Sequence, residues 1–222
     1  MSVDYFENGL CFYCHLAEQD LLHYADFNSR TEELWRREDQ SLQQKIEEIM
    51  NKYPQSDRDE IVDSYAWDLH LNQYKYPDIH RSTVIITVYT FLEDQLNGLC
   101  AVLGESLRSS IRLKDLHGQG IERACLFLSK VALFNLGHIS KLTFVKEVGL
   151  LRNKLIHAGG ILSSNCNDTL NKFVDRTDGL WGEPGEQVRI GPEFFDFLIN
   201  ELIKFIKEID SEVDKFMERH QS

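Results

Sequence analysis

The sequence predicts an all-α fold: a helical bundle with extra N-terminal helices and a long loop before the C-terminal helix. Apolar residues recur every three or four positions along most of the chain, which is the period of an amphipathic helix. No internal repeat or low-complexity linker divides the chain, and 222 residues are enough to bury one core. We therefore expect residues 1–28 to be an N-terminal segment ahead of a single domain over 29–222.

Two helices are expected in the first third of the chain. Ser29 and Glu32 have the spacing of a capping box, which predicts the start of a first long helix, and Pro54 breaks it. The second helix is expected to end at Tyr76-Pro77, because the residue before a proline disfavours helical backbone. We expect these two helices to be antiparallel.

The expected core of the domain covers residues 83–160, together with a C-terminal helix over 192–219. Its first helix ends near Gly104, and its β-branched start, Thr83–Val88, would locally suit a strand. The helical period outweighs that short window, because six residues follow it. These are Ile85, Val88, Leu92, Leu96, Leu99 and Leu103.

Two more helices are expected after the turn at Gly118–Gly120. The first has an apolar stripe from Ile121 to Val131, and the second from Ile139 to Leu155. The pair Gly159-Gly160 is typical of a helix C-terminus and should end the second helix.

The chain between these helices and the last one lacks a clear period. Residues 161–191 are rich in Gly, Asn, Asp and Ser and are expected to be a long loop, with room for a short strand at Gln187–Ile190. Pro192 suits the first turn of a helix. The apolar residues of that helix are Phe195, Leu198, Leu202, Phe205, Ile209, Val213 and Phe216.

Composition and the chain start suggest a cytoplasmic protein without a membrane span. Apolar residues make up 42% and charged residues 27% of the chain, and no apolar run approaches the roughly 18 residues that a span needs. The acidic start lacks the basic and apolar regions of a secretory signal. The number of cysteines is odd, five, which favours reduced thiols over a disulfide framework.

Charge is unevenly distributed along the chain. The net charge of -12 argues against non-specific nucleic-acid binding by the whole surface. The stretch from Arg108 to Lys154, however, holds nine basic and three acidic residues, a balance of +6. This stretch is either a localised site for a polyanion or a set of solvated helix faces.

The motif Arg152-Asn153-Lys154-Leu155-Ile156-His157 combines groups that suit RNA cleavage. A histidine with a near-neutral pKa can take or give a proton. An arginine presents a planar fork of donors to a phosphate and its transition state. Five helical residues turn by about 500°, which leaves Arg152 and His157 roughly 140° apart around the axis. One helix alone therefore makes a poor site.

At this motif the chain resembles the HEPN superfamily, whose signature is an arginine, usually a polar residue, and a histidine four to six residues after the arginine. The segments Tyr89–Asn97 and Leu116–Ala124 look like those that accompany the motif. The resemblance implies a metal-independent endoribonuclease without a cofactor, acting as a homodimer whose paired motifs share one cleft. It also implies RNA as substrate and a bacterial toxin–antitoxin or antiphage setting, with an antitoxin or defence protein as partner.

Within that resemblance, residues take separate roles. Arg152 and His157 are expected to be catalytic and Asn153 to fix the phosphate or the ring, while Glu93 joins a polar network beside the motif helix. Further RNA contacts are expected at Lys154, Lys146 and Arg123.

The chain departs from the HEPN pattern at two positions. Gly159 stands where several HEPN toxins have a tyrosine, and Ala158, directly after the histidine, offers no polar group. With the net charge, these departures favour an alternative: a HEPN-fold module without catalysis that binds RNA, a nucleotide or a protein.

Two other readings stay open. Cys11-Phe12-Tyr13-Cys14-His15 matches the pattern for covalent haem attachment, and Cys11, Cys14 and His15 together with His23 offer four candidate zinc ligands. Buried or reduced thiols are the favoured interpretation, and no metal site is expected. The helically spaced aromatic residues suit the core or a dimer interface, with base stacking as another option. They are Trp35, Trp67, Phe194, Phe195, Phe197 and Phe205.

Overall fold

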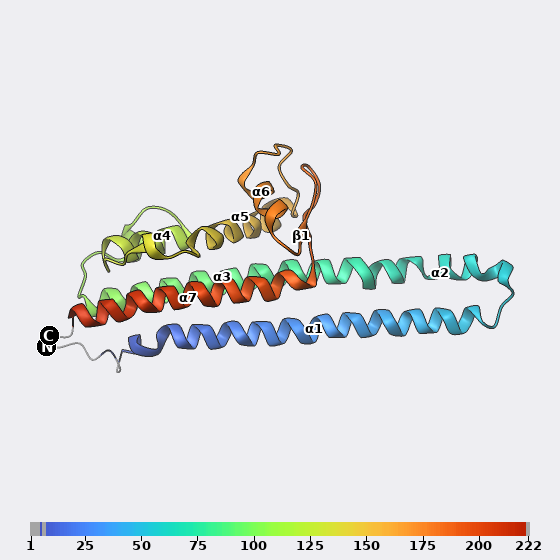
Figure 1. Cartoon of the computed structure of the whole chain (residues 1–222), viewed down its shortest axis with the longest axis horizontal. Helices are drawn as coiled ribbons and strands as arrows, with labels where there is room; N and C mark the ends of the chain where they lie inside the picture. Colours follow the sequence, from blue (N-terminus) through green and yellow to red (C-terminus); the bar gives the residue numbers. More distant parts are fainter. Residues whose placement is uncertain (1–4, 6–7, 221–222) are drawn as a thin grey trace.

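The computed structural model describes residue 5 and residues 8–220, and the fold is mostly helical, as predicted (Figure 1). Its α-helices are α1 (Tyr13–Met50), α2 (Arg58–His70), α3 (Tyr76–Ser106), α4 (Gly120–Lys130), α5 (Leu142–Ala158), α6 (Thr169–Arg176) and α7 (Pro192–His220). Short helical turns are η1 (Leu10–Phe12), η2 (Gln55–Asp57), η3 (Leu71–Lys75), η4 (Leu113–Asp115) and η5 (Leu136–His138). The strands are β1 (Leu180–Trp181) and β2 (Arg189–Ile190).

The long helices form the frame of the bundle. α1 and α7 run side by side with α3, and α4 and α5 follow α3 on the side away from α1 (Figure 1). The six apolar residues predicted to form a stripe on α3 are all buried, and so are the seven on α7. Among the described residues, no helix is both long and apolar enough to cross a membrane.

The first helix begins sixteen positions earlier than predicted, at Tyr13 rather than at Ser29. Residues 13–28 contain neither glycine nor proline, and Cys14, Ala17 and Leu21 are buried in the common core. A capping box can mark a helix start, but its residues also fit inside a helix. Burial of the preceding apolar face keeps the helix continuous here.

The predicted helix end at Tyr76-Pro77 is also wrong. α2 continues through the π-helical turn η3 into α3 without a loop, and Pro77 lies in the first turn of α3. A proline is tolerated where its missing N–H is not needed, and the wider π turn directly before it changes the hydrogen-bond register. The single proline therefore alters the helix locally without ending it.

Beyond the bundle, the second half of α1 and α2 with η3 extend as a two-helix arm, here defined as residues 33–75 (Figure 1). No residue of α2 is buried, and Ile46 is the one buried residue on the α1 side of the arm. The predicted antiparallel pairing is present. The arm, however, has almost no core of its own.

The stretch predicted to be a long loop contains short elements. α6 buries Leu170, Phe173 and Val174 against the bundle, and the side chain of Asp168 caps its first turn. β1 and β2 form an antiparallel pair with Leu180 opposite Ile190, which partly matches the short strand expected at Gln187–Ile190. Eight helical residues in a polar sequence are too few for a clear period, so the sequence did not reveal α6.

Glu212 on α7 fastens the segment after α4 to the bundle, and its carboxylate accepts hydrogen bonds from the backbone N–H of Asn135 at 2.6 Å and from Lys215 at 2.7 Å. Burial disfavours its charge, but these bonds hold the pKa of Glu212 below its usual value. A lowered folded pKa adds stability above the unfolded pKa, and this stability is lost as pH falls through the folded value.

We therefore expect Glu212→Gln to lower the free energy of unfolding by about 1–2 kcal/mol at pH 7 and by much less at pH 3. Urea unfolding at both pH values measures the difference. Glu218→Gln, at an exposed position of the same helix, is the control and should have little effect. An equal loss at both pH values for Glu212→Gln would contradict the assignment.

Candidate functional site

Arg152 lies where α3, α4 and α5 meet. Its Nη1 donates to Asn153 Oδ1 at 2.9 Å, and its Nη2 lies 3.4 Å from Glu93 Oε2 on α3. The guanidinium also stands 5.8 Å from the ring centre of Tyr89, over the ring. The Arg152 and Glu93 side chains are only 22% and 19% exposed. Three of the residues selected from the sequence, Arg152, Asn153 and Glu93, are thus brought together.

Two glycines provide the space for this cluster. A Cβ atom at Gly149, one turn before Arg152, would lie 2.4 Å from the Tyr89 hydroxyl. A Cβ atom at Gly120, at the start of α4, would lie 2.0 Å from Glu93 Oε1, and the φ of Gly120 is +53°. Tyr89 and Gly149 were not selected from the sequence, because only a packed structure shows which helix faces a glycine.

Burial governs the electrostatics of the cluster. It raises the pKa of Glu93, against the opposing pull of Arg152, and the neighbouring Asp94 raises it further. Burial also raises the pKa of Tyr89, with a second contribution from the Glu93 charge. The long 3.4 Å contact compares with about 2.8 Å in a close charge-assisted pair. The Arg152–Glu93 ion pair is therefore long and weak.

His157 lies apart from this cluster. It is exposed in the last turn of α5, which ends at Gly159 in the left-handed conformation (φ +57°), as the Gly-Gly pair predicted. No hydrogen bond or ion pair joins Arg152 and His157 in the described part of the chain. The chain alone does not assemble the two main motif residues into one site, as their angular separation on the helix predicted.

A different set of residues shares the solvent side of α5. Lys146, Leu150, Asn153 and His157 follow the i, i+4, i+7, i+11 spacing of one helix stripe and are all exposed. We call these four residues the α5 outer face. Leu150 is 42% exposed, and Ile156 beside the stripe is 43% exposed, so the face includes apolar surface.

The proposed RNA-contacting cations are spread around α4 and α5. Lys146 is exposed and Lys154 half-buried, while Arg123 donates from Nε to the carbonyl of Gly118 at 2.8 Å. Lys141, also from the basic stretch, is paired with Glu201 at 2.7 Å.

Three further cations of the basic stretch lie around a cavity of about 670 Å³ beside the C-terminal end of α3. They are Arg108, Arg112 and Lys114. The cations of the basic stretch are therefore not gathered around the motif. The +6 balance of that stretch is thus a weak argument for a phosphate site at Arg152 and His157.

The two thiols of the Cys11–His15 segment have different surroundings. Cys11 is exposed, whereas Cys14 is buried. Burial raises the pKa of Cys14 strongly, and the charge of Asp210 and a hydrogen bond to it raise it further. Haem attachment needs both thiols to reach the vinyl groups of the porphyrin, and Cys14 is buried in this structure. Within the described residues, no group of three or more His, Cys, Asp or Glu side chains could hold a metal ion.

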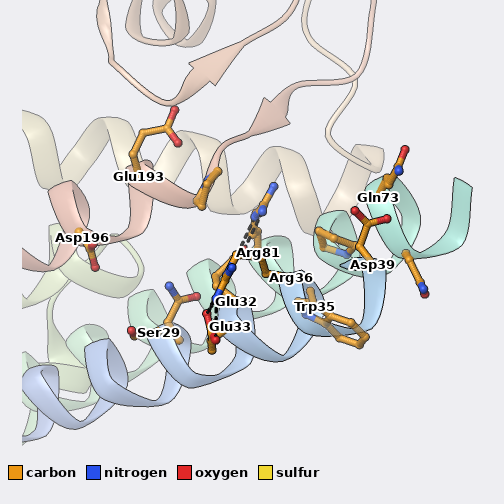
Figure 2. Close-up of a pocket in the computed structure, with 14 residues that line it drawn as sticks. Ser29, Glu32, Glu33, Trp35, Arg36, Asp39, Gln73, Arg81, Glu193 and Asp196 are labelled. Carbon is orange, nitrogen blue, oxygen red and sulfur yellow. Dashed lines mark hydrogen bonds and ion pairs between the residues drawn. The ribbon is translucent and has the colours of Figure 1, made fainter. Parts of the chain in front are cut away.

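A cavity of about 580 Å³ lies between α1, the start of α3 and the start of α7 (Figure 2). Arg81 forms two 2.7 Å bonds to the Glu32 carboxylate there and donates to the carbonyl of Ile190 at 3.0 Å. The ion pair joins α1 to α3, and the hydrogen bond to Ile190 joins β2 to both. Besides Glu32 and Arg81, the charged lining residues are Glu33, Asp39, Glu193, Asp196 and Arg36. Acidic residues dominate the lining, so the cavity does not suit a phosphate.

Comparisons of the chain with protein-family models, curated proteins and solved structures found no match. The resemblance to the HEPN superfamily therefore stands on the motif residues and their helical setting alone.

Proposed function

We propose that the protein is a metal-independent endoribonuclease of the HEPN type, acting as a homodimer with catalytic Arg152 and His157 and supporting Asn153. The observation that carries the proposal is the α5 outer face. There Asn153 and His157 stand in solvent beside exposed Leu150 and Ile156. Exposed apolar side chains next to polar functional groups favour an interface. A two-fold contact through this face brings Asn153 and His157 of both copies to one cleft, and the Arg152 guanidinium reaches its edge through its hydrogen bond to Asn153.

His157 supplies the proton chemistry in this proposal. An imidazole can take the proton of the 2′-hydroxyl, which attacks the adjacent phosphorus, and the second imidazole can protonate the leaving 5′-oxygen. Two His157 side chains, one from each copy, provide the base and the acid. Exposure leaves the ring free to meet RNA without moving packed residues.

Arg152 supplies the positive charge that stabilises the negative charge of the phosphate in this proposal. A guanidinium has five donors, and the buried Nε has no hydrogen-bond partner within the described structure. The long contact to Glu93 leaves the group able to exchange a carboxylate for a phosphate. Asn153 contacts the same guanidinium and can orient it.

The biological setting follows from family analogy. A ribonuclease of this kind acts as a toxin or an antiphage effector, restrained by an antitoxin or another defence-system protein. Its substrate is cellular or phage RNA, and it uses no cofactor.

A second candidate is a HEPN-fold module that binds RNA, a nucleotide or a protein without cleaving. The Arg152 arrangement favours it: the side chain is mostly buried and tied to Glu93 and Asn153, as a structural arginine would be. Arg152 then stabilises the junction of α3 and α5, and the α5 outer face serves only as a contact surface.

Cleavage of labelled RNA in excess chelator distinguishes the two candidates. The wild-type protein is compared with Arg152→Ala and His157→Ala, and the mass of each in solution is measured by light scattering. We expect cleavage by the wild-type dimer and loss of it in both variants. Equal cleavage by the variants would end the catalytic assignment. A dimer that binds RNA and never cleaves it supports the binding module.

A further inference from the structure

An exposed ladder of aromatic rings runs along the arm toward the bundle. Trp67 and His70 are stacked with ring centres 5.7 Å apart, and His70 and Tyr74 follow at 5.7 Å. Trp67 is 69% and Tyr74 56% exposed. We call Trp67, His70 and Tyr74 the aromatic ladder. Because water disfavours large exposed aromatic surfaces, a ladder on a helix without a core suggests a ligand.

The ladder leads to a cavity at the end of the motif helix. The cavity measures about 430 Å³, and its lining includes His70 from α2, Tyr74 and Lys75 from η3, Leu155 from α5, Gly159 directly after α5, and Arg189 from β2. Gly159 is two residues after His157, so the cavity borders the same helix end as the proposed catalytic residue. The aromatic ladder and the cavity are continuous, because His70 and Tyr74 belong to both.

The shape of the helix places these residues together. η3 is a π-helical turn over Leu71–Lys75, and it sets Tyr74 and Lys75 at the cavity. Such turns are rare and often occur at functional positions. Polar side chains of Ser82, Thr83 and Gln187 complete the lining.

Charge around the cavity is compatible with phosphate. Arg189 is paired with Asp78, the one carboxylate of the lining, at 2.5 Å. Lys75 is exposed, and no ion pair to it is found in the described part of the chain. Stacking rings followed by cations is the arrangement that binds single strands.

We infer that the aromatic ladder and this cavity bind a single-stranded RNA segment, with bases stacked on Trp67 and Tyr74 and a phosphate near Lys75. The inference rests on the proposed function for the choice of RNA. It adds a second binding surface outside the motif, and this surface takes unpaired RNA because bases in a duplex cannot present their faces to the rings.

Binding of an uncleavable strand tests the inference separately from catalysis. The probe is a fluorescein-labelled, single-stranded 2′-O-methyl RNA, which lacks the attacking hydroxyl, and fluorescence anisotropy gives the Kd. We expect Tyr74→Leu and Trp67→Leu each to weaken binding about 10-fold. Tyr53→Leu is the matched control, since Tyr53 is 53% exposed on the same arm but lines no part of this cavity. It should leave the Kd unchanged.

The salt dependence of RNA affinity tests whether Lys75 contacts a phosphate. Lys75→Gln should lower the slope of log affinity against log salt by about 0.7, the loss of one phosphate contact on a single strand. The duplex form of the same probe should bind more weakly than the single strand.

Several results would overturn the inference: an unchanged Kd in Tyr74→Leu, equal affinity for the duplex, or a ladder variant that changes the oligomer mass but not RNA affinity. The last result would assign the ladder to a protein interface. Ladder-dependent binding without any RNA cleavage would support the inference and reject the catalytic proposal. Cleavage that depends on His157 but not on the ladder would do the reverse.

Discussion

RNA cleavage should fall by about 10²- to 10⁴-fold in His157→Ala at neutral pH, the usual contribution of a general acid or base. The fold should be unaffected, because His157 is exposed and makes no side-chain hydrogen bond or ion pair in the described part of the chain. Single-turnover cleavage of a defined RNA measures the rate, and circular dichroism checks the fold. A loss of less than threefold would remove His157 from the reaction.

Co-expression of Arg152→Ala and His157→Ala chains tests whether the site is shared. About half of randomly assorted dimers combine the two chains, and each such dimer holds one intact Arg152 and one intact His157. We expect these mixed dimers to regain only part of the activity, because one of the two proton-transfer groups is still missing, while each variant alone stays inactive. A site built within one chain would give no recovery. Arg152 and His157 are separated within one chain, so recovery of activity in mixed dimers would show that two chains share the site.

Gly149→Leu should lower the free energy of unfolding by about 3 kcal/mol, the upper end of the cost of overpacking a core. The glycine is buried, and a Cβ atom there already lies 2.4 Å from the Tyr89 hydroxyl and 2.9 Å from Cζ of the ring. A leucine must therefore displace Tyr89 or α5. Urea unfolding measures the loss, and RNA cleavage should fall with it because Arg152 stands over the same ring.

A double mutant separates this contact from a general effect of losing glycine. Tyr89→Ala opens space opposite residue 149, so Gly149→Leu combined with Tyr89→Ala should be more stable than the sum of the single losses predicts. Gly137→Leu, at an exposed glycine, should change stability by less than about 0.5 kcal/mol. Simple additivity of the two changes at 89 and 149 would show that the ring and the glycine do not interact.

The helical parts of the bundle were predictable because their apolar residues repeat over many turns. The stripes from Ile85 to Leu103 and from Phe195 to Phe216 are buried as expected. Prediction failed where a local signal competes with packing. Ser29 has capping-box spacing but lies inside α1, and Pro77 lies in a helix start that continues an earlier helix. Local patterns report preferences of a few residues, and long-range burial overrides them.

The aromatic residues show the same limit. Phe194, Phe195 and Phe205 are in the core, whereas Phe197 is 40% and Trp67 is 69% exposed, although all five lie on helices. A helical period shows that residues share a face but not whether another helix covers that face. α1 and α2 extend past the end of the bundle, so the ladder residues of the arm meet no covering helix (Figure 1).

For the candidate site, the sequence by itself determined the motif, its place at the end of a helix stopped by Gly159, and the angular separation of Arg152 and His157. All three follow from helix geometry and local backbone preference. Only the tertiary structure decided that Arg152 turns to Glu93 and Tyr89, that Gly149 and Gly120 make room for them, and that His157 stays in solvent. Those facts depend on which helices pack together, which no local pattern encodes.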